Sequence, residues 1–163
     1  MRMARMCPSS IGLGEMTTYG EGSASYVAAG ERDGIARLVD AFYRQMDELP
    51  IAATIRAMHE QDLGRSREKL TVFLCGWLGG PNLYSATFGP ISIPRVHEHL
   101  AIGESERDAW LACMARAVEQ QPWTTDFKHY FMRAIAVPAE RVRLASARAG
   151  SPRAGVRSST QHR

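Results

Sequence analysis

The sequence has few cysteines, no long apolar run near its start and no stretch of alternating polar and apolar residues. Its three cysteines, Cys7, Cys75 and Cys113, are odd in number and far apart, which excludes a disulfide framework or a zinc site. The first ten residues contain two arginines, but Gly, Ser, Glu and Thr follow them instead of an apolar run. This pattern is not that of a signal peptide or membrane anchor. We expect a soluble, reduced, cytoplasmic protein.

The positive charge is concentrated at one end of the chain. The formal net charge is +3, yet residues 140–163 carry six arginines and one glutamate, so the remainder is −2. These last residues are mostly Ala, Gly, Ser, Pro and Arg, with almost no apolar side chain after Leu144. Such composition predicts a basic disordered tail over residues 139–163. It indicates no specific nucleic-acid site, although a weak, salt-sensitive attraction to nucleic acid or anionic membrane stays open.

The chain length sets the number of domains. A chain of 163 residues with 45% hydrophobic composition has apolar material for one compact core. We predict a flexible N-terminal extension over residues 1–25 and one folded domain over residues 26–138, followed by the tail.

Apolar residues recur at intervals of three and four along most of the predicted domain, which is the pattern of amphipathic helices. No internal repeat is visible. We therefore predict an all-α protein of five or six helices, at residues 34–46, 51–59, 65–78, about one turn at Arg95, a segment with Trp110, Leu111, Met114 and Val118, and a last segment with Phe127, Tyr130, Phe131, Ala134 and Ile135.

Glycine and proline mark the predicted ends of these helices. Gly79-Gly80-Pro81 ends the 65–78 helix, and residues 82–93 read as a loop because they contain Gly89 and Pro90. Pro138 is predicted to end the last helix.

Hydroxyl residues mark the predicted starts of two helices. Ser105 with Asp108 forms an imperfect capping box after Gly103, and Thr124 or Thr125 can cap the last helix.

His97 is the residue with the most suggestive position. It lies thirteen residues before Trp110, so an imidazole precedes a long amphipathic helix that carries an indole. This arrangement can hold a haem iron and cover its other face, while an exposed helix histidine is the alternative. His99 competes for the same role, but positions i and i+2 of a helix lie about 200° apart, so only one of the two faces the iron.

From about Gly34 to Met114 the chain resembles the group II truncated haemoglobins, bacterial and plant globins with a shortened two-over-two helical sandwich. The resemblance is carried by LVDAFYRQM (38–46), IRAMHEQDL (55–63), REKL (67–70), FLCGWLGGPNLY (73–84) and IGESERDAWLACM (102–114). The run GWLGGPNLY combined with ERDAWL is its most specific part. The resemblance implies an all-α globin fold and a haem b cofactor, iron protoporphyrin IX.

The resemblance also implies which residues meet the metal and its ligand. His97 matches the proximal histidine, the metal ligand, and its other ring nitrogen should donate to a nearby backbone carbonyl. The family spacing selects His97 over His99 as the metal ligand, and His99 should then face solvent. On the opposite face Tyr43, His59 and Trp110 match the polar cluster that stabilises a diatomic ligand. For Tyr43 and Trp110, simple core packing is the alternative.

Further residues would contact the cofactor. Ser66 lies where most globins carry a distal histidine, and its alternative role is capping a helix start. The remaining apolar positions would line the pocket or serve in the core, and they are Leu70, Phe73, Trp77, Ile102 and Met114.

The chain departs from the family just before His97. An arginine-rich string that helps to hold the haem propionates is replaced by PISIPRVH, and the Pro-Phe that follows the histidine in the family is replaced by His99-Leu100. Lys69, Tyr84 and Arg95 are then the candidate propionate anchors, and fewer ion pairs would loosen the haem without removing the metal bond.

Three functions are compatible with these residues. The first is a globin that binds O2, NO and CO and has NO dioxygenase or peroxidase-like activity, with electrons from a separate reductase because nothing resembles a flavin or nicotinamide site. The second is O2 binding, transport or sensing without turnover. The third is a haem-free helical interaction module. We expect a monomer or weak dimer without specific nucleic-acid or membrane partners.

Overall fold

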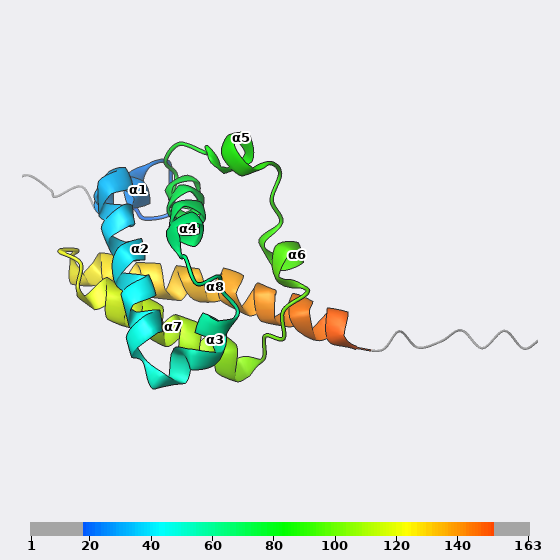
Figure 1. Cartoon of the computed structure of the whole chain (residues 1–163). Helices are drawn as coiled ribbons and strands as arrows, with labels where there is room; N and C mark the ends of the chain where they lie inside the picture. Colours follow the sequence, from blue (N-terminus) through cyan, green and yellow to red (C-terminus); the bar gives the residue numbers. More distant parts are fainter. Residues whose placement is uncertain (1–17, 152–163) are drawn as a thin grey trace, which may run out of the picture.

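The computed structural model describes residues 18–151, in which helices joined by loops and turns are the regular structure and no strand occurs. The predicted all-α class is confirmed. Within these residues no helix is long and apolar enough to cross a membrane. The elements, labelled in Figure 1, are α1 (Ala24–Ala28), α2 (Glu31–Glu48), a 3-10 helix η1 (Pro50–Ala52), α3 (Ala53–Ala57), α4 (Gly64–Trp77), α5 (Tyr84–Phe88), α6 (Ile93–His97), α7 (Glu104–Glu119) and α8 (Thr125–Gly150).

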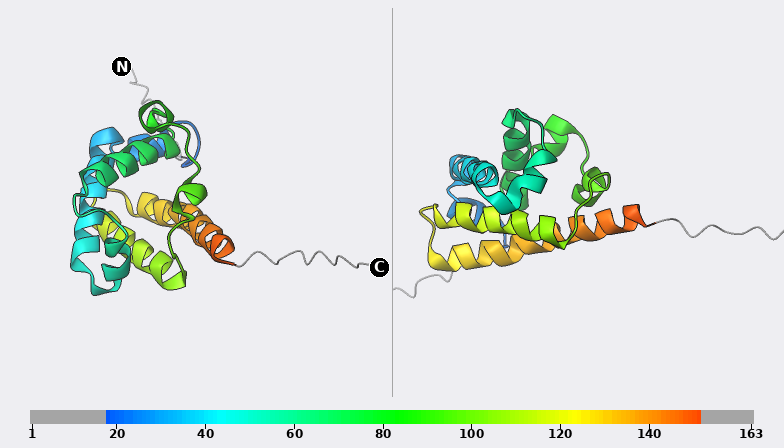
Figure 2. Two further views of the ribbon diagram at one scale, coloured as in Figure 1. Left: turned by 45° about the vertical axis from the view of Figure 1, so that its right-hand side comes forward. Right: turned by 60° about the horizontal axis from the view of Figure 1, so that its bottom comes forward.

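Four long helices form two crossing layers. The right-hand view of Figure 2 shows α7 and α8 side by side in one layer, with α2 and α4 across them. The apolar stripe of α2 causes this packing, because it places Ile35, Leu38, Phe42 and Met46 on one face, each 0–1% exposed. The two-over-two architecture is the one predicted.

Aromatic rings join the layers at the start of α8. The ring of Phe131 lies 6.0 Å from that of Trp77 on α4 and 5.3 Å from that of Trp123, and Phe127 packs 4.8 Å from Trp123. Phe127 and Phe131 are 1% and 0% exposed, respectively. Large buried rings at this junction fix α4 over α8, which positions everything that α4 carries.

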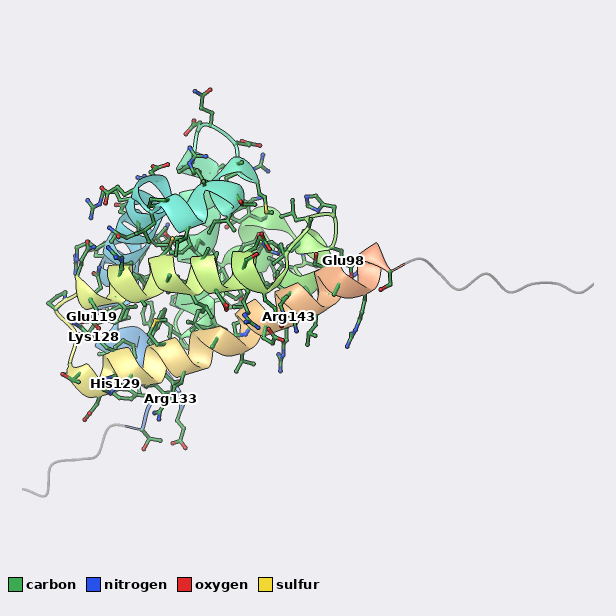
Figure 3. All side chains as sticks on the ribbon, turned by 90° about the horizontal axis from the view of Figure 1, so that it is seen from below. Glu98, Glu119, Lys128, His129, Arg133 and Arg143 are labelled. Carbon is green, nitrogen blue, oxygen red and sulfur yellow. The ribbon has the colours of Figure 1, made fainter. Side chains whose placement is uncertain are left out.

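The turn between α7 and α8 is bounded by two caps. Thr124 Oγ1 accepts a hydrogen bond from Phe127 N at 3.3 Å, which confirms one of the predicted caps of the last helix. Lys128 Nζ lies 3.1 Å from the Glu119 carbonyl and 3.4 Å from its carboxylate, and Figure 3 shows the two side chains together at this end. The exposed ion pair adds little stability but closes the connection.

The end of α4 follows the predicted glycine signal. Gly79 has φ +91°, and a Cβ there would lie 1.9 Å from the Gly22 carbonyl oxygen. Only glycine tolerates both the left-handed conformation and this close approach. The segment just before α1 is thereby packed against the end of α4.

Three predictions about the helices are wrong. Helix α7 begins at Glu104 rather than after Ser105, because the Glu106 carboxylate accepts the Gly103 N–H at 2.8 Å and supplies the cap that Ser105 and Asp108 were expected to form. The predicted loop over 82–93 contains the short helix α5. Short helices such as α1 and α5 raise the number of α-helices to eight in residues 18–151, against five or six predicted.

The predicted end of the last helix at Pro138 is also wrong. Helix α8 continues through Pro138 to Gly150, so residues 139–150 are helical, and residues 152–163 of the predicted tail lie outside the described part. A proline inside a helix removes one backbone hydrogen bond. Contacts beyond the proline offset this loss, because Glu140 on α8 accepts a 2.6 Å hydrogen bond from Arg107 on α7.

Ordered packing begins before residue 26, the predicted start of the domain. The Tyr19 ring lies 5.0 Å from Phe127 and 5.2 Å from Tyr130, and Ser25 is buried and accepts the Gly20 N–H at 2.9 Å. We propose a folded domain that includes at least Tyr19 to Gly150. Cys75 and Cys113 are buried and free, whereas Cys7 lies outside the described residues.

Candidate functional site

His97 is the last residue of α6, and its ring is half-buried. Its Nδ1 lies 2.7 Å from the Ile93 carbonyl oxygen, one helical turn earlier. A carbonyl only accepts hydrogen bonds, so Nδ1 carries the proton and Nε2 keeps a free lone pair. The expectation that a backbone carbonyl fixes the His97 tautomer is confirmed.

The surroundings of His97 favour its neutral form. Burial lowers the pKa of His97 below its ordinary value, and the nearby charges of His59 and His99 act in the same direction, while the Ile93 hydrogen bond opposes them. A neutral imidazole is the form that binds a metal.

The other histidines differ in exposure. His99 is exposed, which confirms that it faces solvent, and His129 is exposed on α8. His162 lies outside the described residues. His59 follows α3 and is half-buried, with Nδ1 2.8 Å from the Ile55 carbonyl oxygen. His59 therefore repeats the arrangement of His97, with Nδ1 bonded one turn back and Nε2 free.

Tyr43 lies on the buried face of α2 and is 4% exposed. Burial raises the pKa of its phenol to about 12, although a hydrogen bond with Ser66 and the charge of Arg67 act against this rise. The phenol thus keeps its proton at neutral pH and remains a hydrogen-bond donor. Ser66, in the first turn of α4, lies beside Tyr43.

Three ring contacts connect the predicted ligand-side residues. Trp110 on α7 packs 5.1 Å from Phe42, Phe42 lies 5.0 Å from Tyr43, and Tyr43 meets His59 edge-on at 5.8 Å between centroids. With Phe42 between Trp110 and Tyr43, the predicted trio of Tyr43, His59 and Trp110 is one contiguous group, which comes from α2, the segment after α3 and α7. The core packing that was the alternative for Tyr43 and Trp110 is present as well.

Two of the three indoles, Trp123 and Trp110, differ in their hydrogen bonding. Trp123 Nε1 donates to the Ala29 carbonyl oxygen at 3.1 Å. Within residues 18–151 the Trp110 N–H has no such protein acceptor, and the ring is half-buried. A half-buried indole N–H without an acceptor is available to a ligand.

The predicted lining residues divide by burial. Leu70, Phe73 and Trp77 on α4 are only partly buried, although they are large and apolar and pack against the core. Met114 is fully buried and serves in the core. Ile102 is half-buried, and its N–H donates to Ser146 Oγ at 3.0 Å.

Two of the three candidate propionate anchors lie together. The Lys69 ammonium lies 5.6 Å from the Phe88 ring centroid, and Phe88 packs 5.2 Å from Tyr84. Burial raises the pKa of Tyr84, with the charge of Arg65 opposing it. Arg95 lies apart on α6 and is exposed. Phe88 is not among the residues predicted from the sequence, because the predicted loop over 82–93 hides the helix α5 that carries it.

His59 also borders a surface hollow of about 500 Å³. The ends of α2 and α3 form this hollow, and the Asp47–Arg56 ion pair lies in its wall at 2.6 Å. Neither His97 nor Trp110 lines it. The hollow is therefore separate from the histidine and indole pair.

The residues present fit a haem. The donor set offers one neutral imidazole with a free Nε2 on α6, and phenol and indole donors on α2 and α7. The partly exposed apolar side chains of α4 offer the contact surface that an apolar macrocycle needs. A shortened two-over-two helical fold with this set of side chains defines a haem globin.

The chain belongs to the bacterial-like globin family, whose pattern matches residues 24–142. It is 33% identical over 97 residues to the group 2 truncated hemoglobin YjbI of Bacillus subtilis (strain 168), covering 60% of this chain and 70% of that protein. The resemblance to group II truncated haemoglobins is confirmed.

Solved structures agree with this assignment. A group II 2-on-2 hemoglobin from the plant pathogen Agrobacterium tumefaciens is 31% identical, with a TM-score of 0.70 over 80% of this chain and 98% of that one. A truncated oxygen-avid haemoglobin from Bacillus subtilis is 26% identical, with a TM-score of 0.66 over 72% and 97%. The chain is thus a haem-binding and O2-binding globin by family.

Proposed function

We propose that this globin binds haem b through His97 and combines O2 binding with redox chemistry on NO or peroxide. The observation that carries the proposal is the His97 imidazole, whose Nδ1 is bonded to the Ile93 carbonyl and whose Nε2 is free. Haem supplies the iron that binds diatomic gases and changes oxidation state. The protein supplies the binding, the orientation and the electrostatic environment.

His97 supplies an oriented and neutral ligand nitrogen. The Ile93 carbonyl holds the ring in one tautomer and increases the electron density at Nε2. The lowered pKa of His97 keeps the imidazole unprotonated at neutral pH, because burial penalises the charged form.

Tyr43, Trp110 and His59 supply hydrogen bonds to a diatomic ligand. The buried Tyr43 phenol retains its proton, and the Trp110 N–H has no acceptor within residues 18–151. A hydrogen bond to a partly charged acceptor contributes roughly 1.5–3 kcal/mol. Slow O2 release follows, and one solved relative is described as oxygen-avid.

The remaining predicted contacts have supporting roles. Leu70, Phe73 and Trp77 would cover the face of the macrocycle and exclude water, while Ser66 would hold the Tyr43 phenol. Lys69 and Tyr84, and separately Arg95, would hold the propionates. Turnover would take electrons from a separate reductase.

The first experiment tests the metal bond. We expect apoprotein titrated with haemin to give a Soret band and a one-to-one endpoint, and His97→Ala to lose the ligated spectrum. His99→Ala is the matched control, since it removes an exposed imidazole only two residues away. A His97→Ala spectrum like that of the wild type would refute the assignment.

The second experiment separates chemistry from O2 carriage. The O2-saturated ferrous protein is mixed with NO in a stopped-flow instrument. Conversion to ferric protein with one nitrate released per haem supports NO dioxygenation. The alternative function, O2 binding or sensing without turnover, predicts no nitrate, and the same test with peroxide and a reducing dye examines the peroxidase-like reaction.

A further inference from the structure

The part of α8 beyond Pro138 lies alongside α6, the helix that ends at His97. Both views of Figure 2 show the two helices together, and they are in contact. Figure 3 shows Glu98, which follows His97, over the C-terminal end of α8. The part of α8 after the proline therefore packs against the segment that contains His97.

One buried hydroxyl connects these helices. Ser146 is 7% exposed, and its Oγ donates to the Leu100 carbonyl oxygen while accepting the Ile102 N–H at 3.0 Å. A serine hydroxyl has one proton to donate and lone pairs to accept, so a single side chain satisfies both groups. The turn at residues 100–102 is thereby bonded to α8 on both sides.

The same turn is bonded directly to His97. The Leu100 N–H donates to the His97 carbonyl oxygen at 3.0 Å. The hydrogen bonds thus run from Ser146 through Leu100 to the backbone of His97, and from the His97 ring to Ile93. Because α6 has only five residues, its own helical bonds restrain it weakly.

The position of Ser146 depends on the anchoring of α8 after the proline. Glu140 accepts hydrogen bonds of 2.6 Å from Arg107 on α7 and from Arg143 on α8. Apolar side chains next to the proline add little packing, because Val137 before it and Leu144 after it are 51% and 39% exposed. Glu140 thus holds this part of α8 to α7, and Ser146 supplies hydrogen bonds between α8 and the segment that follows His97.

Ser146 lies outside the stretch that the family pattern matches, which ends at residue 142. We propose that Ser146 is a positioning residue that fixes the His97 imidazole by clamping the 100–102 turn to α8. The inference rests on the proposed role of His97 as the metal ligand. Ser146 acts through the backbone and touches neither haem nor gas.

The experiment compares three variants of the full-length holoprotein. Ser146→Ala removes the clamp, and Ser146→Thr restores a hydroxyl at the same place. Ser151→Ala is the matched control, because the Ser151 hydroxyl only donates to Ala147 within the same helix region. The main measurement is the iron–histidine stretching band of the ferrous, ligand-free protein by resonance Raman spectroscopy.

We expect Ser146→Ala to shift or broaden this band and to release haem to apomyoglobin roughly 5–10-fold faster, the size of one lost hydrogen bond. Ser146→Thr should return both values toward the wild type, and Ser151→Ala should change neither. In the apoprotein, faster amide exchange at Ile102 in Ser146→Ala gives a readout without haem. Far-UV circular dichroism checks that every variant is folded.

The outcomes separate the two proposals. If His97→Ala retains the iron–histidine band, the proposed ligand is wrong, whatever Ser146 does. If His97→Ala loses the band but Ser146→Ala is indistinguishable from Ser151→Ala in band, haem release and Ile102 exchange, the clamp alone is refuted. Failure of Ser146→Thr to restore the band would also refute it.

Discussion

The ligand side and the His97 side of the site are built in different ways. Tyr43 belongs to the 18-residue helix α2 and lies in the apolar core, 4% exposed and beside the fully buried Phe42. His97 ends the five-residue helix α6, half-buried, and depends on hydrogen bonds to Ile93 and, through Leu100, to Ser146. Packing fixes one side, and a few polar contacts fix the other.

This difference suggests a division of labour. Donors that must stay dry and protonated are placed in the core, where burial raises the pKa of a phenol. A metal ligand must instead keep one nitrogen uncovered, so it sits on a short segment at the edge of the core. Changes to one side should therefore leave the other side largely intact.

The largest expected effect is on the ligand side. Phe42→Ala should lower the free energy of unfolding of the apoprotein by about 3–5 kcal/mol, because it leaves a cavity beside Tyr43 and Trp110. Urea unfolding followed by circular dichroism measures it. Val96→Ala on α6, where the side chain is 47% exposed, is the matched change on the other side and should cost less than about 0.5 kcal/mol. Equal losses would contradict the comparison.

Next in size is the loss of one donor on the ligand side. Tyr43→Phe keeps the ring and removes the hydroxyl, so O2 should dissociate roughly 10–100-fold faster, as expected for a lost bond to a charged acceptor. Stopped-flow displacement of O2 by CO measures the rate. Tyr130→Phe on α8 serves as the control, and the iron–histidine band should stay unchanged in both variants. An O2 dissociation rate unaffected by Tyr43→Phe would remove the phenol from the ligand site.

The sequence predicts the ligand side better than the His97 side, for a physical reason. The stripe of Ile35, Leu38, Phe42 and Met46 repeats every three or four residues, so α2 and its buried face can be read locally. The tautomer of His97 follows from metal-ligand chemistry and was also predicted.

The extension of α8 could not be predicted in this way. Pro138 is a helix-breaking signal in its local sequence, whereas the contacts that override it come from Arg107 and from the turn at Leu100 and Ile102, more than thirty residues away in sequence. Composition pointed to a disordered tail because Ala, Ser and Arg carry little apolar surface. A single serine that bonds two backbone groups leaves no repeating pattern in the sequence, so its role cannot be recognised there.

A smaller effect is expected from pH on the stability of the C-terminal part of α8, which packs against the His97 segment. Hydrogen bonds from Arg143 and Arg107 lower the pKa of Glu140 from its ordinary 4.5 to about 2. The carboxylate thus contributes stability above pH 4.5 that is lost as the pH falls through about 2. Glu140→Gln should remove this part of the acid dependence of the apoprotein.

Amide exchange of residues 140–150 between pH 5 and 2.5 measures this dependence. In the wild type, the protection of these amides should fall as the pH falls, after correction for the pH dependence of intrinsic exchange. In Glu140→Gln this protection should already be missing at pH 5. Asp126→Asn, an exposed carboxylate at the start of α8, is the control. Identical profiles for the wild type and Glu140→Gln would show that the Arg107 contact does not hold this end of the helix.

The last prediction is that the O2 dissociation rate does not change between pH 7 and 10. Because the pKa of Tyr43 is about 12, its phenol stays protonated up to about pH 10, so the O2 dissociation rate should be flat between pH 7 and 10. Above pH 10 the unfolded chain loses the phenolic proton first, and stability should fall with rising pH. A rate that increases between pH 8 and 10 in the wild type, but not in Tyr43→Phe, would mean that the phenol ionises within the site.

The claim that His97 supplies the metal bond is tested most directly by chemical rescue. His97→Gly leaves space for a free imidazole, and His99→Gly provides the same change at an exposed neighbour. We predict that ferrous His97→Gly lacks the iron–histidine stretching band and regains a band when millimolar imidazole is added, while His99→Gly behaves as the wild type throughout. A His97→Gly protein that shows the native band without added imidazole would contradict the account.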